Sequence, residues 1–103
     1  MKRLSYSAEA VLNLKEIFDH IETNFSKRQA SDVVNAIFEK IASLERMPYL
    51  GRISEVSESV REFVVKGNVI FYHLTDTSIE IVYIKPRKTI GIFDESSEKS
   101  DSS

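Results

Sequence analysis

The chain has 103 residues, of which 42% are hydrophobic and 29% charged, and it contains no cysteine. This size predicts one compact domain, and the lack of cysteine excludes a disulfide framework and thiolate chemistry. No apolar run approaches the ~20 residues of a membrane span and the N-terminus lacks an apolar leader, so we expect a cytoplasmic protein without membrane contact.

Charge is unevenly distributed along the chain. Residues 94–103 carry four acidic side chains and one lysine, and this acidic, Ser-rich composition predicts a disordered tail after a single domain at residues 1–93. Without the tail's charge of −3, the total of −2 becomes +1 for the remainder. A nearly neutral domain argues against direct nucleic-acid binding, which usually needs a strongly basic face.

The N-terminal half predicts a short strand at Leu4 and Ser5 and then two amphipathic helices. Apolar residues recur at spacings of three and four from Ala8 onward. The two stripes are Val11, Leu14, Phe18, Ile21 and Phe25, and then Ala30, Val34, Ile37, Ile41 and Leu44. Ser26 with Gln29 forms a capping-box pattern between them, and Pro48 is expected to close the second helix. So short a linker predicts an antiparallel helical hairpin that needs a sheet as cover.

The C-terminal half predicts three strands, at roughly 61–66, 69–74 and 79–84, with Gly67-Asn68 as a two-residue hairpin loop. Alternation then assigns one almost wholly apolar face to the helices. Its members are Arg61, Phe63, Val65, Ile70, Tyr72, Leu74, Ile79, Ile81 and Tyr83. The predicted fold is α+β: a helical hairpin on one face of a small, mainly antiparallel sheet of three to four strands.

The opposite face offers two features, and Arg61 stands out on the apolar face. Val64, Phe71 and Val82 would form one apolar row that suits docking of a peptide. His73 would lie between Glu62 and Glu80, as an acid-base centre or, more simply, as a solvent-facing charge cluster. Arg61 lies on the apolar side, so we expect the aliphatic part of its side chain to pack on the core and its guanidinium group to pair with a helix carboxylate.

A group of basic residues marks the turn and the end of the last strand. Its members are Lys66, Lys85, Arg87 and Lys88. They form either a patch facing an acidic or phosphate-bearing partner or ordinary solubilising charge. No phosphate-binding glycine loop, metal-spaced Cys/His set or G-x-S-x-G motif is present, so we expect no cofactor and no metal site.

The predicted elements follow one another in a fixed order. They are two helices, the loop Pro48-Tyr49-Leu50-Gly51-Arg52, the strand Val60-Arg61-Glu62-Phe63 and the strand that runs from Gly67 to Tyr72. This order resembles the RelE/ParE superfamily of toxins from bacterial type II toxin-antitoxin operons, from about Arg3 to Lys88. RelE-like members are ribosome-dependent endoribonucleases that cut messenger RNA. ParE-like members poison DNA gyrase and are not known as nucleases.

The resemblance favours the ParE-like branch. The ribonuclease branch sets cations where this chain has Val60, Glu62 and Val69, and a tyrosine or histidine near Phe93; such cations stabilise charge developing on a phosphate. Many ParE-like proteins end the last strand with a histidine and a basic pair, whereas here Lys85-Pro86-Arg87-Lys88 keeps only the basic character.

The resemblance implies a toxin that inhibits gyrase by binding, with no catalytic residue of its own, and that a cognate antitoxin neutralises. Its target-binding residues would be Lys66, Lys85, Arg87 and Lys88. The antitoxin would dock on the row Val64, Phe71 and Val82 and on exposed hairpin surface. One alternative is a ribosome-dependent mRNA endoribonuclease that uses Arg87, Lys66 and His73. Another is a degenerate, non-toxic antitoxin-binding module.

Overall fold

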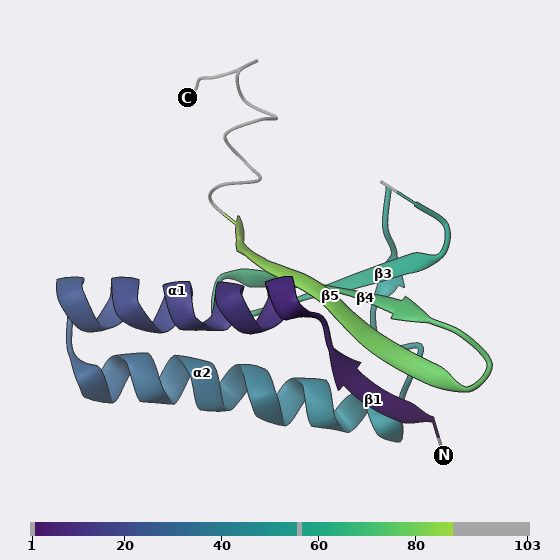
Figure 1. Cartoon of the computed structure of the whole chain (residues 1–103), viewed down its shortest axis with the longest axis horizontal. Helices are drawn as coiled ribbons and strands as arrows, with labels where there is room; N and C mark the ends of the chain where they lie inside the picture. Colours follow the sequence, from purple (N-terminus) through teal and green to yellow (C-terminus); the bar gives the residue numbers. More distant parts are fainter. Residues whose placement is uncertain (1, 56, 88–103) are drawn as a thin grey trace.

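The computed structural model of the chain describes residues 2–55 and 57–87. Its elements in chain order are β1 (Arg3–Tyr6), α1 (Ala8–Asn24), α2 (Lys27–Ala42), the 3-10 helix η1 (Ser43–Glu45), β2 (Arg52–Ile53), β3 (Val60–Val65), β4 (Asn68–Leu74) and β5 (Ser78–Pro86). The strands form one sheet in the order β1-β5-β4-β3-β2, with β1 parallel to β5 and the other pairs antiparallel. The helices run antiparallel beside each other against this sheet (Figure 1). The predicted α+β fold is confirmed, with two short edge strands that enlarge the sheet to five.

Both helices begin where the sequence places their caps. The Ser7 hydroxyl accepts a hydrogen bond from the Ala10 N–H at 3.0 Å, and the Ser26 hydroxyl accepts one from the Gln29 N–H at 3.0 Å. Each satisfies a donor that the first helical turn leaves unpaired. The second helix ends earlier than predicted, at Ala42, and the 3-10 turn η1 then continues the chain toward Pro48. No helix in residues 2–55 and 57–87 is long and apolar enough to cross a membrane.

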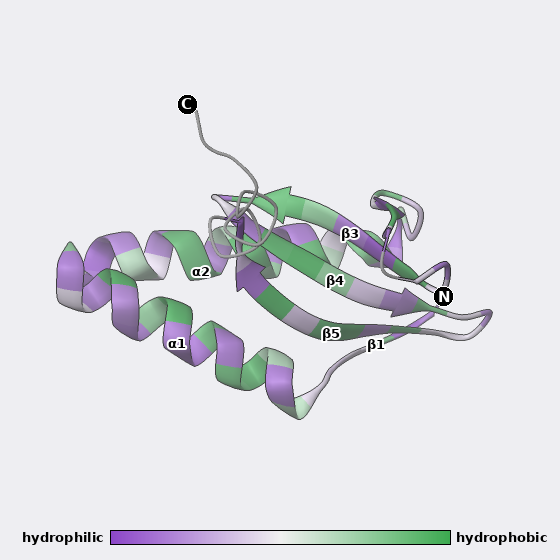
Figure 2. Cartoon of the chain, turned by 90° about the horizontal axis from the view of Figure 1, so that it is seen from above, coloured by the Kyte–Doolittle hydropathy of each residue, from purple (hydrophilic) through white to green (hydrophobic). Residues whose placement is uncertain are grey.

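The core lies between the helical hairpin and the facing side of the sheet. Its buried members are Ala10, Leu14, Ile17, Ile37, Ile41, Leu44, Ile70, Tyr72, Ile79, Ile81 and Ile84. Figure 2 shows the middle of β4 and β5 in hydrophobic colours and the end of β5 in a hydrophilic one. Burial of each large aliphatic side chain stabilises the fold by about 1.5–3 kcal/mol, so this one cluster dominates stability.

The buried face of α1 differs from the predicted stripe. Val11 and Phe25 are 57% and 68% exposed, whereas Ala10, Asn13 and Ile17 are buried. The helix contacts β5 as well as α2, and this second contact turns the buried face toward positions 10, 13 and 17. A stripe of apolar residues cannot reveal this rotation, because one of the buried positions is an asparagine.

Asn13 fixes α1 to the sheet. β1 covers only the first part of β5, since its pairing runs from Arg3 with Ser78 to Tyr6 with Ile81. Beyond that point the edge of β5 meets α1, where the Asn13 Oδ1 accepts a hydrogen bond from the Ile84 N–H at 2.9 Å. The Ser7 hydroxyl donates to the Val82 carbonyl oxygen nearby. The side chains of Ser7 and Asn13 therefore hydrogen-bond the edge of β5 beyond the residues that pair with β1.

The β3–β4 hairpin keeps the predicted faces but not the predicted register. The loop residues are Lys66 and Gly67, with φ values of 51° and 79°, and Val65 pairs with Asn68. This is the geometry of a type I′ turn, which needs two residues with positive φ. The loop therefore lies one residue earlier than Gly67-Asn68, and every cross-strand partner changes by two positions.

Lys66 occupies a backbone conformation that asparagine or glycine adopts at lower cost. We expect Lys66→Asn to raise the free energy of unfolding by about 0.5–1 kcal/mol, as measured by urea denaturation. Lys66→Gln is the matched control, because it removes the same charge without relieving the backbone, and it should leave stability unchanged. Equal stability of the two variants would contradict a strained turn.

A bulge interrupts the β4–β5 pairing. Phe71 pairs with Tyr83 and Tyr72 with Ile81, so Val82 is an extra residue on β5. The extra residue shifts the alternation of side chains along β5 by one position. Ile84 therefore faces the core, and Tyr83 lies with Phe71 on the other face. The predicted placement of Tyr83 on the core face is therefore wrong, and Ile84, 1% exposed, takes its place.

Candidate functional site: the basic end of the sheet

The turn between β3 and β4 and the end of β5 lie together at one end of the sheet. Asn68 pairs with Pro86, and the Arg87 N–H donates to the Gly67 carbonyl oxygen at 2.8 Å. These contacts bring together Lys66, Lys85 and Arg87, which we call the basic end. Lys88, the fourth predicted target-binding residue, lies outside the described residues.

The three cations of the basic end differ in their partners. Lys85 Nζ lies 3.2 Å from the Glu9 carboxylate and 5.7 Å from the centre of the Tyr83 ring, so α1 and a neighbouring aromatic hold it. Lys66 and Arg87 are exposed, and no carboxylate among residues 2–55 and 57–87 pairs with either. The positive charge available to a partner therefore comes from Lys66 and Arg87.

A groove of about 700 Å³ opens beside the basic end. One wall is α1, with Ile17 and Ile21 as its apolar part and Glu16 and His20 as its polar part. The other wall is the turn at 66–68 with the last residues of β5. The groove thus combines apolar side chains with a charged rim. No group of three potential metal-ligating side chains occurs in the described parts of the chain.

The structure separates the residues of the predicted nuclease set. Lys66 and Arg87 lie at the turn, whereas His73 is five residues along β4 from Asn68, a span of roughly 17 Å at the rise of an extended strand. His73 is paired with Val60 and Glu80 rather than lying between two glutamates. The other expected neighbour, Glu62, forms an ion pair with Arg52 at 3.0 Å. Lys66, Arg87 and His73 thus do not converge on one reacting group.

The predicted docking row Val64, Phe71 and Val82 is also divided. Val64 pairs with Val69, Phe71 pairs with Glu62 and Tyr83, and Val82 is the bulged residue. Phe71 is only 6% exposed and meets the Tyr83 ring edge-on at 4.5 Å, whereas Val64 is 45% exposed. These side chains therefore do not form the continuous open row that alternation from Gly67-Asn68 predicted.

A second feature, at the other end of β4, anchors the loop between η1 and β2. The Tyr72 hydroxyl donates to the Pro48 carbonyl oxygen at 2.7 Å and accepts from the Gly51 N–H at 2.9 Å. The Arg61 guanidinium donates to the Gly51 carbonyl oxygen at 2.6 Å and lies 4.9 Å from the centre of the Tyr49 ring. Arg61 therefore holds a loop carbonyl and an aromatic ring, and not the helix carboxylate that was predicted.

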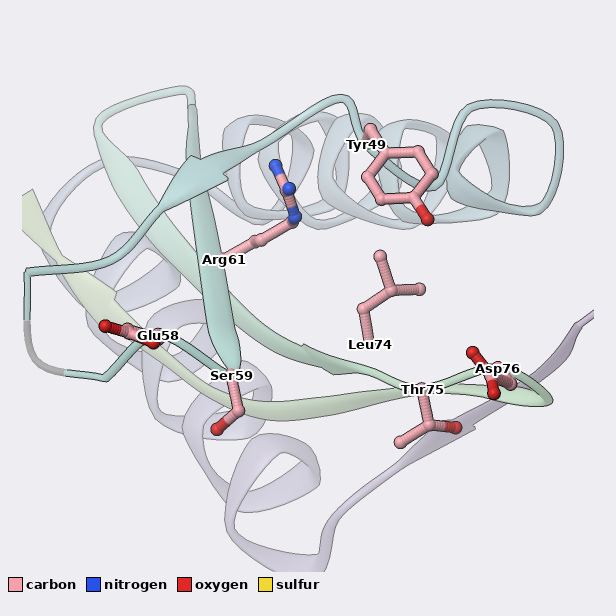
Figure 3. A pocket seen from close by; sticks show the side chains of 7 residues that line it. All are labelled: Tyr49, Glu58, Ser59, Arg61, Leu74, Thr75 and Asp76. Carbon is pink, nitrogen blue, oxygen red and sulfur yellow. The ribbon is translucent and has the colours of Figure 1, made fainter.

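This anchor borders a small cleft of about 220 Å³. In Figure 3, Arg61 and Leu74 reach toward Tyr49, and Asp76 and Glu58 lie at opposite sides of the opening. The cleft mixes one half-buried cation with two carboxylates at its rim, a net charge of −1 that does not favour an anion. We assign it a structural role in holding the loop.

Burial raises the pKa of the Tyr72 hydroxyl above its usual 10.0, while the Gly51 hydrogen bond and the Arg61 charge oppose the shift. A group whose pKa is higher in the folded state contributes stability that is complete below the unfolded pKa and lost as the pH rises through the folded one. We therefore expect the free energy of unfolding to fall above about pH 10, and to fall less in Tyr72→Phe. Urea denaturation between about pH 8 and 11 measures both, and identical pH dependence would contradict the assignment.

One comparison with known proteins identifies a family, and another identifies structures of the same fold. Residues 4–91 match the model of the family described as ParE toxin of type II toxin-antitoxin system, parDE. No curated protein sequence matches the chain. Among solved structures, a chromosomal ParDE toxin-antitoxin system from P. aeruginosa has a TM-score of 0.75 at 23% identity, covering 84% of this chain and 96% of that one. The E. coli DinJ-YafQ complex has a TM-score of 0.57 at 12% identity, covering 87% and 98%.

The two kinds of comparison support different conclusions. At such low identity the structural matches establish a shared fold. The family match covers most of the chain, including both helices and every residue of the five strands except Arg3. The chain therefore belongs to the ParE toxins of type II toxin-antitoxin systems.

Proposed function

We propose that this toxin inhibits DNA gyrase by binding it through the basic end, without bond chemistry of its own, in the cytoplasm. Membership of the ParE family supports the choice of gyrase. The observation that carries the choice of surface is the pair of exposed cations, Lys66 and Arg87, which no carboxylate in the described parts of the chain neutralises. Unpaired cations at one end steer and bind an acidic partner surface.

The backbone at Lys66 adds a second argument. A lysine with φ of 51° costs stability that asparagine in the same turn would recover. A strained residue that the surrounding fold maintains is a reason to expect a function there. Lys66 presents its ammonium group from the tip of the hairpin, where a large partner can reach it.

A cognate antitoxin is the second partner that we propose. The P. aeruginosa match is a ParDE system, which contains a toxin together with its antitoxin. On this chain, the exposed apolar side chains of the helical hairpin favour such a contact: Val11, Leu12 and Phe38 are 57%, 54% and 43% exposed. Large exposed apolar side chains are the kind of surface that a protein partner covers. Addition of the antitoxin should restore supercoiling in the assay below, and failure to do so would remove it as a partner.

The test is gyrase supercoiling with full-length protein. We expect the unchanged toxin to inhibit at micromolar dose, and Lys66→Gln combined with Arg87→Gln to need a roughly tenfold higher dose, the equivalent of about 1.4 kcal/mol lost in a binding interface. The matched control is Lys27→Gln with Arg28→Gln, which removes the same two charges from the exposed start of α2. It should inhibit like the unchanged toxin.

Two outcomes would contradict the proposal. Supercoiling that the unchanged toxin leaves untouched would remove gyrase as the target. An equal loss in both double variants would show that overall charge, and not the basic end, determines inhibition.

A further inference from the structure

The described chain ends at the basic end itself. Arg87 is hydrogen-bonded through its N–H to the Gly67 carbonyl oxygen, next to Lys66 in the same turn. The chain therefore continues from a residue that lies beside two cations with no ion-pair partner in the parts of the chain described.

The sequence that follows has the opposite charge. Residues 94–103 contain Asp94, Glu95, Glu98 and Asp101 against Lys99, a net charge of −3, and the remaining 93 residues carry +1. This acidic segment also lies beyond residues 4–91, which match the ParE family. The family match therefore does not account for this segment.

We propose that the acidic segment 94–103 binds in cis to Lys66 and Arg87 and competes with partners of the basic end. The contact concerns this chain alone; only its effect on inhibition rests on the proposed function. The segment would then make the toxin less potent when charges are weakly screened and more potent when salt or a competing partner displaces it.

The distances permit this contact. Seven residue steps separate Arg87 from Asp94, which span at most roughly 25 Å when extended, and Lys66 is already beside Arg87 through the Gly67 hydrogen bond. A short tether raises the effective concentration of its end to about millimolar. Charge pairs that would be too weak between separate molecules can therefore hold a substantial fraction of the chains in the bound form.

The surrounding charges limit where the segment can lie. Glu9 already pairs with Lys85, and Glu16 lines the α1 wall of the groove. Both carboxylates repel an acidic segment from the helix side. The segment should therefore approach from the turn, where Lys66 and Arg87 are exposed, and the contact should weaken strongly with salt because exposed charges are screened beyond about 8–10 Å.

The absence of cysteine permits a clean test on the full chain. Ser102→Cys introduces a single thiol for a nitroxide spin label, whose broadening of backbone amide NMR signals reports proximity. At about 30 mM salt we expect the Gly67 and Asn68 signals to broaden several-fold more than that of Thr77, which lies in the turn at the opposite end of β4. At about 500 mM salt the difference should shrink to the smaller value that an unbound, tethered tail gives.

The matched control keeps the tail length and removes its charge, through Asp94→Asn, Glu95→Gln, Glu98→Gln and Asp101→Asn in the labelled chain. A several-fold weaker broadening at Gly67 in this variant supports the proposal. Equal broadening at Gly67 and Thr77 in the unchanged tail, or broadening at Gly67 that neutralisation does not reduce, overturns it. This readout involves no gyrase, so it stands or fails independently of the proposed target.

The consequence for function is a change in potency. In the supercoiling assay at low salt, the full-length chain with the neutral tail should inhibit at a roughly two- to fivefold lower dose than the unchanged toxin. If the NMR contact is present and the dose is unchanged, the segment binds the basic end without competing there, and the competition is refuted.

Discussion

Gly51→Ala should be far more damaging than Gly67→Ala, the other Gly→Ala change in the described chain. A Cβ at Gly51 would lie 2.7 Å from the Glu62 carbonyl oxygen and 2.9 and 3.0 Å from the Tyr72 ring and hydroxyl. Backbone on one side and a fully buried tyrosine on the other leave no room for relaxation. Overpacking of this kind, with loss of the Tyr72 hydrogen bonds, should lower the free energy of unfolding by about 3 kcal/mol.

Gly67→Ala is the matched control, because the same methyl group meets nothing within 4 Å there and costs only the strain of φ +79°. That strain amounts to about 1 kcal/mol. Urea denaturation of the two variants separates a steric effect from a conformational one. Equal losses of stability would mean that the loop moves away freely and that Tyr72 does not anchor it.

The strand faces could be predicted from the sequence, whereas the pairing between strands could not. Two-residue loops at Lys66-Gly67 and at Gly67-Asn68 both send Phe63 and Ile70 to one side, because the two registers differ by two positions. Alternation therefore cannot distinguish them. The choice depends on whether Lys66 accepts a positive φ, and a lysine gives no such signal.

The error in register explains the errors at the predicted surfaces. The row Val64, Phe71 and Val82 and the set of His73 between Glu62 and Glu80 both assume the later loop. The β5 bulge then changes the partners again, and no glycine or proline near Val82 marks it. The grouping of the basic end was accessible to prediction for a different reason: the β3–β4 turn and the end of β5 lie at the same end of three consecutive antiparallel strands in either register.

The buried face of α1 was the other feature that the pattern of apolar residues could not predict. A helix that contacts both a neighbouring helix and a strand edge buries two different strips, and in α1 the second strip contains Asn13, which is 4% exposed. Polar residues on a helix are usually solvated, so the sequence offers no reason to place this one against β5. The Asn13 amide is needed there because β1 does not pair with the last part of β5, whose edge requires another hydrogen-bond partner.

Asn13→Ala should therefore cost far more than an ordinary helix substitution. It removes the acceptor of the Ile84 N–H, a buried donor at the edge of β5, and an unsatisfied buried donor costs about 1–3 kcal/mol. Asn35→Ala is the matched control: the same change at an exposed site of α2 should be neutral or stabilising by a few tenths of a kcal/mol, since alanine favours helix. Urea denaturation compares the two, and hydrogen exchange of the Ile84 amide should accelerate only in Asn13→Ala. If the two variants unfold alike, the edge of β5 is satisfied in another way and α1 packs there through apolar contacts alone.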